Sequence, residues 1–299
     1  MNSDFQIFAA PMAGITDQPF RKILRRLNPS VPIMTEMISC HSITSRAGRS
    51  PAGRNADLYF NDNVGAQIFG AEPKLMAEAA KILEGNGAKW IDINMGCPVP
   101  KVATRACAGA FLMKDHPLAG EIMRSVVAAV KVPVSIKTRL GWDEQHLDCD
   151  DLLRIAFESG ISFAIVHART RAQGYSGKAR WELIPSARGK RPPVVFNGDI
   201  KTERDVLAVK NLGAVGAMIG RAMLGNPWLL AKRQDVRDVV GEHFDSTLSY
   251  YGSQGVLMFR KHLAWYAAGM PGAAQFRQRA NRIADADEMK KAIAEFWRN

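Results

Sequence analysis

The chain has 299 residues, of which 47% are hydrophobic and 23% are charged, a composition usual for a globular protein. This length suits one large barrel with a small appendage or two medium domains, and no apolar run reaches the roughly 18 residues that a membrane span needs. The formal charge of +11 and the pI near 9.7 favour an anionic partner, most simply nucleic acid.

Eight short apolar segments predict β-strands that alternate with helices. The strand segments are residues 7–11, 31–37, 64–70, 91–94, 134–139, 163–167, 193–199 and 215–221. A helix opens near Thr16, and helical periodicity continues over 72–84, 116–130, 150–158 and 202–211. Strands that recur every 30 residues or so, with helices between them, predict a (β/α)8 TIM barrel.

A doubly wound open sheet is the alternative α/β arrangement. Such a sheet usually carries a glycine-rich phosphate fingerprint after its first strand. Here Gly14 follows the first strand without the neighbouring glycines of that fingerprint. We therefore predict a barrel over residues 1–235.

The sequence pattern over residues 236–299 predicts a small C-terminal helical domain. Helices are expected over 244–265 and 272–297, separated by Gly269-Met270-Pro271-Gly272. No Asp or Glu occurs between residues 246 and 284, where basic side chains are interleaved with aromatic ones. These side chains could contact RNA phosphates and stack on bases, or the aromatic ones could pack the helical core. Both interpretations stay open at this point.

Polar residues stand where the predicted barrel strands end. The active site of this fold lies at the carboxyl ends of the strands, so convergent polar groups there indicate a binding site. Glycine-containing loops after the seventh and eighth strands suit a phosphate, and Lys137 and Gln67 suit the ring of a phosphorylated flavin. A Schiff base on Lys137 is the alternative chemistry. The strand-end residues are Pro11, Met12, Ala13, Glu36, Gln67, Asn94, Cys97, Lys137, Arg139, His167, Arg169, Asn197, Gly198, Asp199, Gly220 and Arg221.

Cysteine usage points to a reducing compartment. Cys40, Cys97, Cys107 and Cys149 lie far apart without a C-x-x-C pair, so we expect neither disulfides nor a metal site. The N-terminus shows no signal-peptide pattern, and we expect a cytoplasmic protein. Cys97 follows the fourth strand between glycine and proline, where it could be a small buried hydrophobe or a reactive thiol.

The spacing of several motifs resembles the tRNA-dihydrouridine synthases, and most of all their bacterial B-type branch. The resemblance extends over nearly the whole chain. The motifs are APMAGITD at 10–17, QIFG at 67–70, DINMGCP at 92–98, KTRLGW at 137–142, HART at 167–170, NGDI at 197–200, MIGRA at 218–222 and FRKHLAWY at 259–266. The loop over 99–110 matches the family only in part, and Ala168 replaces a common glycine.

The resemblance implies an enzyme that uses FMN and NADPH to reduce chosen uridines of the tRNA D-loop to 5,6-dihydrouridine. The barrel would be catalytic, and the helical domain would bind tRNA through residues such as Arg260, Lys261 and Arg277. Asn94, Arg139 and Arg169 would approach the substrate. A monomer without membrane attachment is expected. FMN would be held by Pro11, Met12, Ala13, Gln67, Lys137, His167, Asn197, Gly198, Asp199, Gly220 and Arg221.

The resemblance also implies a role for Cys97 as the proton donor. Hydride from reduced FMN would reach C6 of the uracil ring, and the Cys97 thiol would protonate C5 from the opposite face. Three other hypotheses are a free-pyrimidine FMN oxidoreductase like dihydroorotate dehydrogenase, a flavin-free lyase that uses Lys137, and a non-catalytic RNA-binding module.

Overall fold

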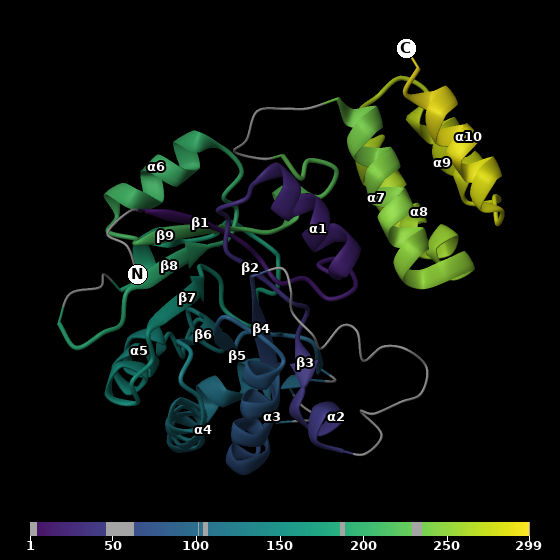
Figure 1. The fold of residues 1–299 in the computed structure, drawn as a ribbon. Coiled ribbons are helices and arrows are strands. Elements are labelled where there is room, and N and C mark those ends of the chain that lie inside the picture. Colours follow the sequence, from purple (N-terminus) through teal and green to yellow (C-terminus); the bar gives the residue numbers. More distant parts are fainter. Residues whose placement is uncertain are drawn as a thin grey trace. The chain divides into compact units, whose positions relative to one another are not determined.

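Eight parallel strands close into a barrel in a computed structural model that describes residues 5–45, 63–100, 102–103, 107–185, 189–228 and 235–298 (Figure 1). Each barrel strand pairs with the next, β9 pairs back with β1, and β2 pairs with both β1 and β4. The closure confirms the predicted (β/α)8 barrel and excludes the open sheet. The strands are β1 (Gln6–Ala9), β2 (Ile33–Met34), β4 (Val64–Phe69), β5 (Ile91–Asn94), β6 (Val134–Arg139), β7 (Phe163–His167), β8 (Val194–Asn197) and β9 (Gly216–Ile219).

Four helices of the barrel, over residues 73–85, 116–129, 149–158 and 203–211, begin and end close to the predicted positions, whereas the short helix over 40–44 lies where a polar loop was expected. Asp115 caps the helix that follows it by accepting a hydrogen bond from the Leu118 N–H, and Thr202 and Asp205 form a capping box on a later helix. These helices are α2 (Cys40–Thr44), α3 (Pro73–Gly85), α4 (His116–Ala129), α5 (Cys149–Glu158) and α6 (Glu203–Asn211), with short 3-10 turns η4 (Gly109–Lys114) and η5 (Trp181–Leu183).

The predicted second strand, residues 31–37, is interrupted. It forms β2 and a separate strand β3 (Ile38–Ser39), which pairs with the end of β4. Between them, the Thr35 hydroxyl accepts the Gln67 backbone N–H at 3.1 Å and donates to the Glu36 carbonyl at 2.7 Å. A side-chain hydroxyl therefore takes the place of a ladder carbonyl, and the strand breaks there.

The inside of the barrel changes from apolar to polar along the strands. Side chains of a strand alternate between its two faces, so residues two apart point to the same side. Apolar side chains fill the interior with Trp90 packed against them: Phe8, Ala10, Met34, Phe163, Ile165, Val195 and Met218. Toward the carboxyl ends the same faces carry two register pairs, Asn94 with Lys137 and His167 with Asn197, and His167 is also aligned with Arg139. The polar residues predicted at the strand ends therefore share one end of the barrel.

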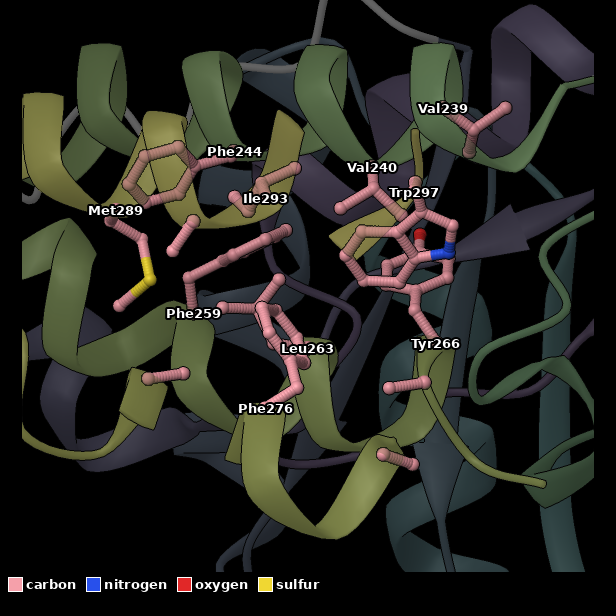
Figure 2. Close-up of a cluster of buried hydrophobic side chains, with 14 of the residues drawn as sticks. Val239, Val240, Phe244, Phe259, Leu263, Tyr266, Phe276, Met289, Ile293 and Trp297 are labelled. Carbon is pink, nitrogen blue, oxygen red and sulfur yellow. The ribbon is translucent and has the colours of Figure 1, made fainter. Parts of the chain in front are cut away.

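A second unit consists of helices around its own apolar core (Figure 2). Its helices are α1 (Gln18–Leu27), α7 (Val236–Tyr251), α8 (Gly255–Tyr266), α9 (Ala273–Ala280) and α10 (Ala286–Phe296), with 3-10 turns η6 (Arg221–Met223) and η7 (Gly252–Gln254). The core takes Val240 and Phe244 from α7, and Phe259 from α8. Ile23 of α1 belongs to the same core, although it lies more than two hundred residues earlier in the chain.

The two long helices predicted for the C-terminal part are in fact four. Gly252 adopts φ 61° between α7 and α8, in the left-handed region that favours glycine. Asp285 starts a new helix by accepting a hydrogen bond from the Glu288 N–H at 2.8 Å, so α9 and α10 are separate. The predicted break at 269–272 is confirmed. Single-sequence periodicity missed the other two breaks because the apolar pattern continues across them.

Contacts divide the chain into a barrel unit, Met1–Gly14 with Pro32–Ile219, and a helical unit, Ile15–Val31 with Gly220–Asn299. The sequence placed the boundary between residues 235 and 236 and assigned α1 to the barrel. By contacts, the C-terminal segment of the helical unit instead starts at Gly220, and the segment Ile15–Val31, which contains α1, belongs to the same unit. The functional division into a catalytic and a tRNA-binding domain stays a prediction.

Candidate active site

Cys97 lies in the turn directly after β5, and its side chain is half-buried. The backbone N–H groups of Gly96 and Cys97 donate to Oδ1 of Asn94 at 3.2 and 3.0 Å. The Cys97 carbonyl accepts the Ala110 N–H at 3.2 Å. The thiol is thus held on an ordered turn at the carboxyl end of the barrel, where the sequence predicted a reactive group. Cys40 and Cys149 are buried, whereas Cys107 is exposed.

Asp92 is a site residue that the sequence analysis did not single out. It is fully buried, and it accepts hydrogen bonds from Ser135 Oγ at 2.6 Å and Gln67 Nε2 at 2.7 Å. Burial raises the pKa of Asp92 to about 7, while the hydrogen bonds from Ser135 and Gln67 and the charge of Lys137 oppose that rise. Its position two residues before Asn94 on the same strand face was the available signal.

Lys137 and Asn197 form the next contact along the mouth of the barrel. The Lys137 ammonium donates to Asn197 Oδ1 at 3.2 Å, and Asn197 Nδ2 donates to the Met218 carbonyl at 2.8 Å. Burial lowers the pKa of Lys137 to about 8, with a further contribution from the charge of Arg139. Lys137 is still mainly protonated at pH 7, so it supplies positive charge to this end of the barrel.

His167 is held by Arg169, whose own hydrogen bonds stay within the barrel. Arg169 Nη1 lies 3.3 Å from His167 Nε2; since an arginine can only donate, Nε2 accepts and the ring proton of neutral His167 is on Nδ1. Arg169 also pairs with Asp199 at 2.6 Å and donates to the carbonyls of Ser176 and Gly177. With only 2% of its surface exposed, Arg169 has little to offer RNA directly.

Asp199 and Gly198 shape the loop after β8. Asp199 adopts φ 54° and Gly198 φ 107°, and a Cβ added at Gly198 would lie 2.7 Å from the His167 ring. The Asp199 carboxylate accepts from Arg169 and from the Ala179 N–H at 2.9 Å, so it faces the segment that follows β7. Glycine at 198 therefore permits a backbone path that a side chain would block.

Arg139 reaches toward the turn that carries Cys97. Its Nε donates to the Gly96 carbonyl at 2.7 Å, and its Nη1 donates to the carbonyls of Thr170 and Gly174 at 3.1 and 2.8 Å. Within the described part of the chain Nη2 has no acceptor. Tyr175, which the sequence did not single out, lies over the Arg139 guanidinium at 5.6 Å and near the His167 ring at 6.0 Å. No sequence pattern marked this loop residue.

The remaining predicted cofactor residues follow the first and the last strand of the barrel. Pro11, Met12 and Ala13 follow β1, with Pro11 and Met12 half-buried and Ala13 exposed. Gly220 and Arg221 follow β9 directly but belong to the helical unit. Their share in a phosphate site stays a prediction.

The basic residues predicted for RNA differ in exposure. Arg277 is exposed, Lys261 is half-buried, and Arg260 donates to the Ile283 carbonyl at 2.7 Å. Phe259, Tyr266 and Phe276 are core residues, so the core interpretation holds for these three aromatics. His262 is buried, and burial lowers its pKa to about 3, so it adds no positive charge near neutral pH.

Metal sites and membrane spans are absent from the described residues. No group of three or more His, Cys, Asp or Glu side chains there could hold a metal ion. None of the helices in the same ranges has the length and apolar character to cross a membrane. Residues 101 and 104–106, part of the loop that departs from the family pattern, lie outside the described ranges.

Comparison with known proteins gives a consistent family. The family model described as "Dihydrouridine synthase (Dus)" matches residues 8–299. A relative from Rickettsia conorii named "Probable tRNA-dihydrouridine synthase" is 38% identical, and the match covers 97% of this chain and 93% of the relative. "tRNA-dihydrouridine synthase B" from Pseudomonas aeruginosa is 36% identical over 98% of this chain and 92% of its own length.

Solved structures with low sequence identity share the barrel fold. Histamine dehydrogenase from Rhizobium sp. 4-9 superposes with a TM-score of 0.54 at 14% identity, over 81% of this chain and 49% of the dehydrogenase. A morphinone reductase mutant in complex with tetrahydroNAD gives a TM-score of 0.52 at 12% identity, over 75% of this chain and 85% of the reductase. At these identities the likeness is one of fold.

Proposed function

Because this chain belongs to the dihydrouridine synthase family, we propose that it reduces uridines of the tRNA D-loop to 5,6-dihydrouridine, with bound FMN and with NADPH as the reductant. The observation that carries the proposal is a family match over residues 8–299 that includes every polar residue at the barrel mouth. The named relatives support tRNA as the substrate and favour it over a free pyrimidine.

The barrel residues fit a phosphorylated flavin. Within the described ranges the Lys137 ammonium donates only to Asn197, which leaves two of its three N–H groups for a ligand. Gln67 carries a second amide hydrogen and a second lone pair beyond its protein contacts, which suit the imide edge of a flavin ring. The backbone path at Gly198 suits close approach of a phosphate. We assign the phosphate to residues 197–199 and 220–221, and a further contact to Pro11, Met12 and Ala13.

FMN, when bound and reduced by NADPH, would supply a hydride for C6 of the uracil ring. The Cys97 thiol would hold the proton that C5 then needs, on the turn fixed by Asn94. Lys137 would offset the negative charge that develops during the transfer. Asn94 and the Nη2 group of Arg139 would hold the uracil. Beyond its bond to Gln67, the Asn94 NH2 group contacts only the Met37 sulfur among the described residues, at 3.9 Å, so it keeps a hydrogen that a uracil oxygen could accept.

The helical unit would hold the tRNA body while the target base leaves its stack. Among the predicted contacts, exposed Arg277 is best suited to a phosphate and half-buried Lys261 next, whereas buried Arg169 would support His167 instead. A monomer in the cytoplasm is part of the same proposal.

The proposal is tested by mapping dihydrouridine position by position in tRNA from cells that lack this gene, followed by reconstitution. Purified protein with FMN, NADPH and unmodified tRNA should restore the missing modification, and free uridine or orotate should not be consumed. Turnover of a free pyrimidine with none on tRNA would replace the proposal with the dihydroorotate dehydrogenase-like alternative.

A further inference from the structure

The turn that carries Cys97 defines the orientation of the Asn94 side chain. Two backbone N–H groups, of Gly96 and Cys97, point at one atom of the Asn94 amide, at 3.2 and 3.0 Å. A backbone N–H can only donate, so that atom must be the oxygen. The Asn94 NH2 group must therefore face the other way, toward Gln67.

The same reasoning passes through Gln67 to Asp92. Asn94 Nδ2 lies 2.9 Å from Gln67, so Gln67 must present its oxygen there and turn its own NH2 group toward Asp92 at 2.7 Å. Asp92 must then accept. Its second oxygen is taken by Ser135 at 2.6 Å. Each amide has one permitted orientation, set by the backbone at one end and by a carboxylate at the other.

We propose that Asp92 is a positioning residue for Cys97, acting through the Gln67 and Asn94 side-chain amides. The ionised carboxylate of Asp92 only accepts, so above its pKa of about 7 the series of hydrogen bonds runs in one direction, and the Asn94 oxygen stays on the turn. An amide at position 92 could donate instead and allow both side chains to flip. The Asn94 NH2 group would then meet the two backbone N–H groups, and the turn would lose its acceptor.

A role for Asp92 as a mere counter-charge to Lys137 is the competing explanation. Lys137 donates to Asn197, whereas the two hydrogen bonds that Asp92 accepts come from Ser135 and Gln67. The partners of Asp92 therefore favour the amide series. The proposal rests on the proposed function only in taking Cys97 as the proton donor, and its test does not need turnover.

The test is the rate at which iodoacetamide alkylates Cys97, measured over a pH range in a Cys107→Ser background. Cys107 is exposed and would also react, whereas Cys40 and Cys149 are buried. Asp92→Asn should change the rate by about fivefold or more and shift its pH profile, because the surroundings of the thiol set its reactivity. Ser135→Ala should stay within about twofold, since it leaves the amide series intact.

A double variant, Asp92→Asn with Gln67→Glu, separates the two explanations. The amide introduced at position 92 can donate to the carboxylate introduced at position 67. That carboxylate can accept from Asn94, and the Asn94 oxygen stays on the turn. The double variant should recover the wild-type alkylation rate within about twofold, although its charge has moved. A folded Asp92→Asn variant with wild-type alkylation would overturn the proposal.

If the double variant does not recover the wild-type alkylation rate, the proposed action through the two amides is overturned as well. If Asp92→Asn does not fold, the double variant alone decides, because only the amide series expects it to fold and to react normally. In turnover, Asp92→Asn should lower kcat by about tenfold with the KM for tRNA unchanged. The two proposals can fail separately. If the alkylation rates change as expected but the wild type forms no dihydrouridine, the proposed function is rejected and the positioning role of Asp92 stands.

Discussion

At the residue scale, Cys97 and Cys107 form a natural pair for comparison. Neither is in a disulfide. Cys97 is half-buried and has its backbone N–H bound by a site residue, Asn94, whereas the Cys107 side chain is exposed. Position on an ordered turn, rather than the presence of a thiol, distinguishes the proposed proton donor.

We predict that Cys97→Ala keeps bound FMN and its reduction by NADPH but lowers dihydrouridine formation by about 100-fold or more, since a general acid is lost. Stopped-flow absorbance follows the flavin, and mass spectrometry of the tRNA follows the product. Cys107→Ser is the matched control and should keep both steps. Full turnover by Cys97→Ala would remove Cys97 from the mechanism.

The buried carboxylate and ammonium give stability a defined pH dependence. Burial raises the pKa of Asp92 from 3.8 to about 7, so the native chain holds this proton when the unfolded chain has released it. This group therefore lowers the free energy of unfolding as pH rises from about 4 to about 7, by up to about 4 kcal/mol. Lys137, whose pKa is lowered from 10.5 to about 8, releases its proton early, so its contribution raises stability between those values.

We predict that the difference in unfolding free energy between Asp92→Asn and wild type grows in favour of the variant as pH rises from about 4 to about 7, then levels off. Urea unfolding at several pH values measures this difference in unfolding free energy. The contributions of the other carboxylates are the same in both proteins and cancel in the difference. A difference that is constant with pH would show that Asp92 titrates normally.

At the element scale, two glycines of α7 have opposite roles, one inside the helix and one at its C-terminal end. Gly252 adopts φ 61° where α7 ends, whereas Gly241 lies inside α7; a Cβ at either position meets nothing within 4 Å. Space is therefore equal at the two positions, and only backbone conformation differs.

We predict that Gly252→Ala lowers the free energy of unfolding by about 1 kcal/mol, because alanine is strained at positive φ. Gly241→Ala should raise it by about 0.5–1 kcal/mol, since alanine favours a helix. Chemical denaturation of the two variants checks both signs. Equal effects would mean that α7 and α8 form one continuous helix, as the periodicity alone had suggested.

Element boundaries were predicted well where a local signal exists. Helix α6 starts at the Thr202 capping box, and α4 follows Asp115 with a proline in its first turn. The break at Thr35 depends on a hydrogen bond to Gln67, 32 residues away, and no local pattern reveals it. Local chemistry decides helix starts, whereas pairing decides where a strand is interrupted.

At the scale of the whole molecule, the tRNA contacts can be tested through salt dependence. Arg277 is exposed on α9, in a stretch without acidic residues. We predict that Arg277→Ala weakens tRNA binding and lowers the slope of log affinity against log salt by up to about one, because one phosphate contact is lost. Filter binding at several salt concentrations measures the slope.

Lys210→Ala is the control for nonspecific charge. Lys210 is exposed but lies 5.6 Å from the ring of Phe5, which precedes β1 and so marks the amino end of the barrel. The active site of this fold is at the opposite end, so the variant should bind tRNA normally. If Arg277→Ala and Lys210→Ala lose tRNA affinity equally, the net charge of the protein, rather than a specific contact of Arg277, would explain the loss.

The helical unit is not a simple C-terminal appendage. Ile23 and Leu27 of α1 are buried in its core, and the Tyr251 hydroxyl donates to Asp17 at 3.0 Å. A truncation near residue 235 would therefore leave an apolar face of α1 uncovered.

The sequence by itself determined the barrel, its strand order and the polar residues at its mouth, including Gln67, Lys137 and His167. These follow from alternation within strands and from the regular strand–helix repeat, which are local patterns. Tertiary structure decided which of those residues bond one another: Asp92 to Gln67, and Arg169 to Asp199. It also decided that α1 joins helices more than two hundred residues away. Such choices depend on which side chains pairing and packing bring together, and sequence periodicity does not encode them.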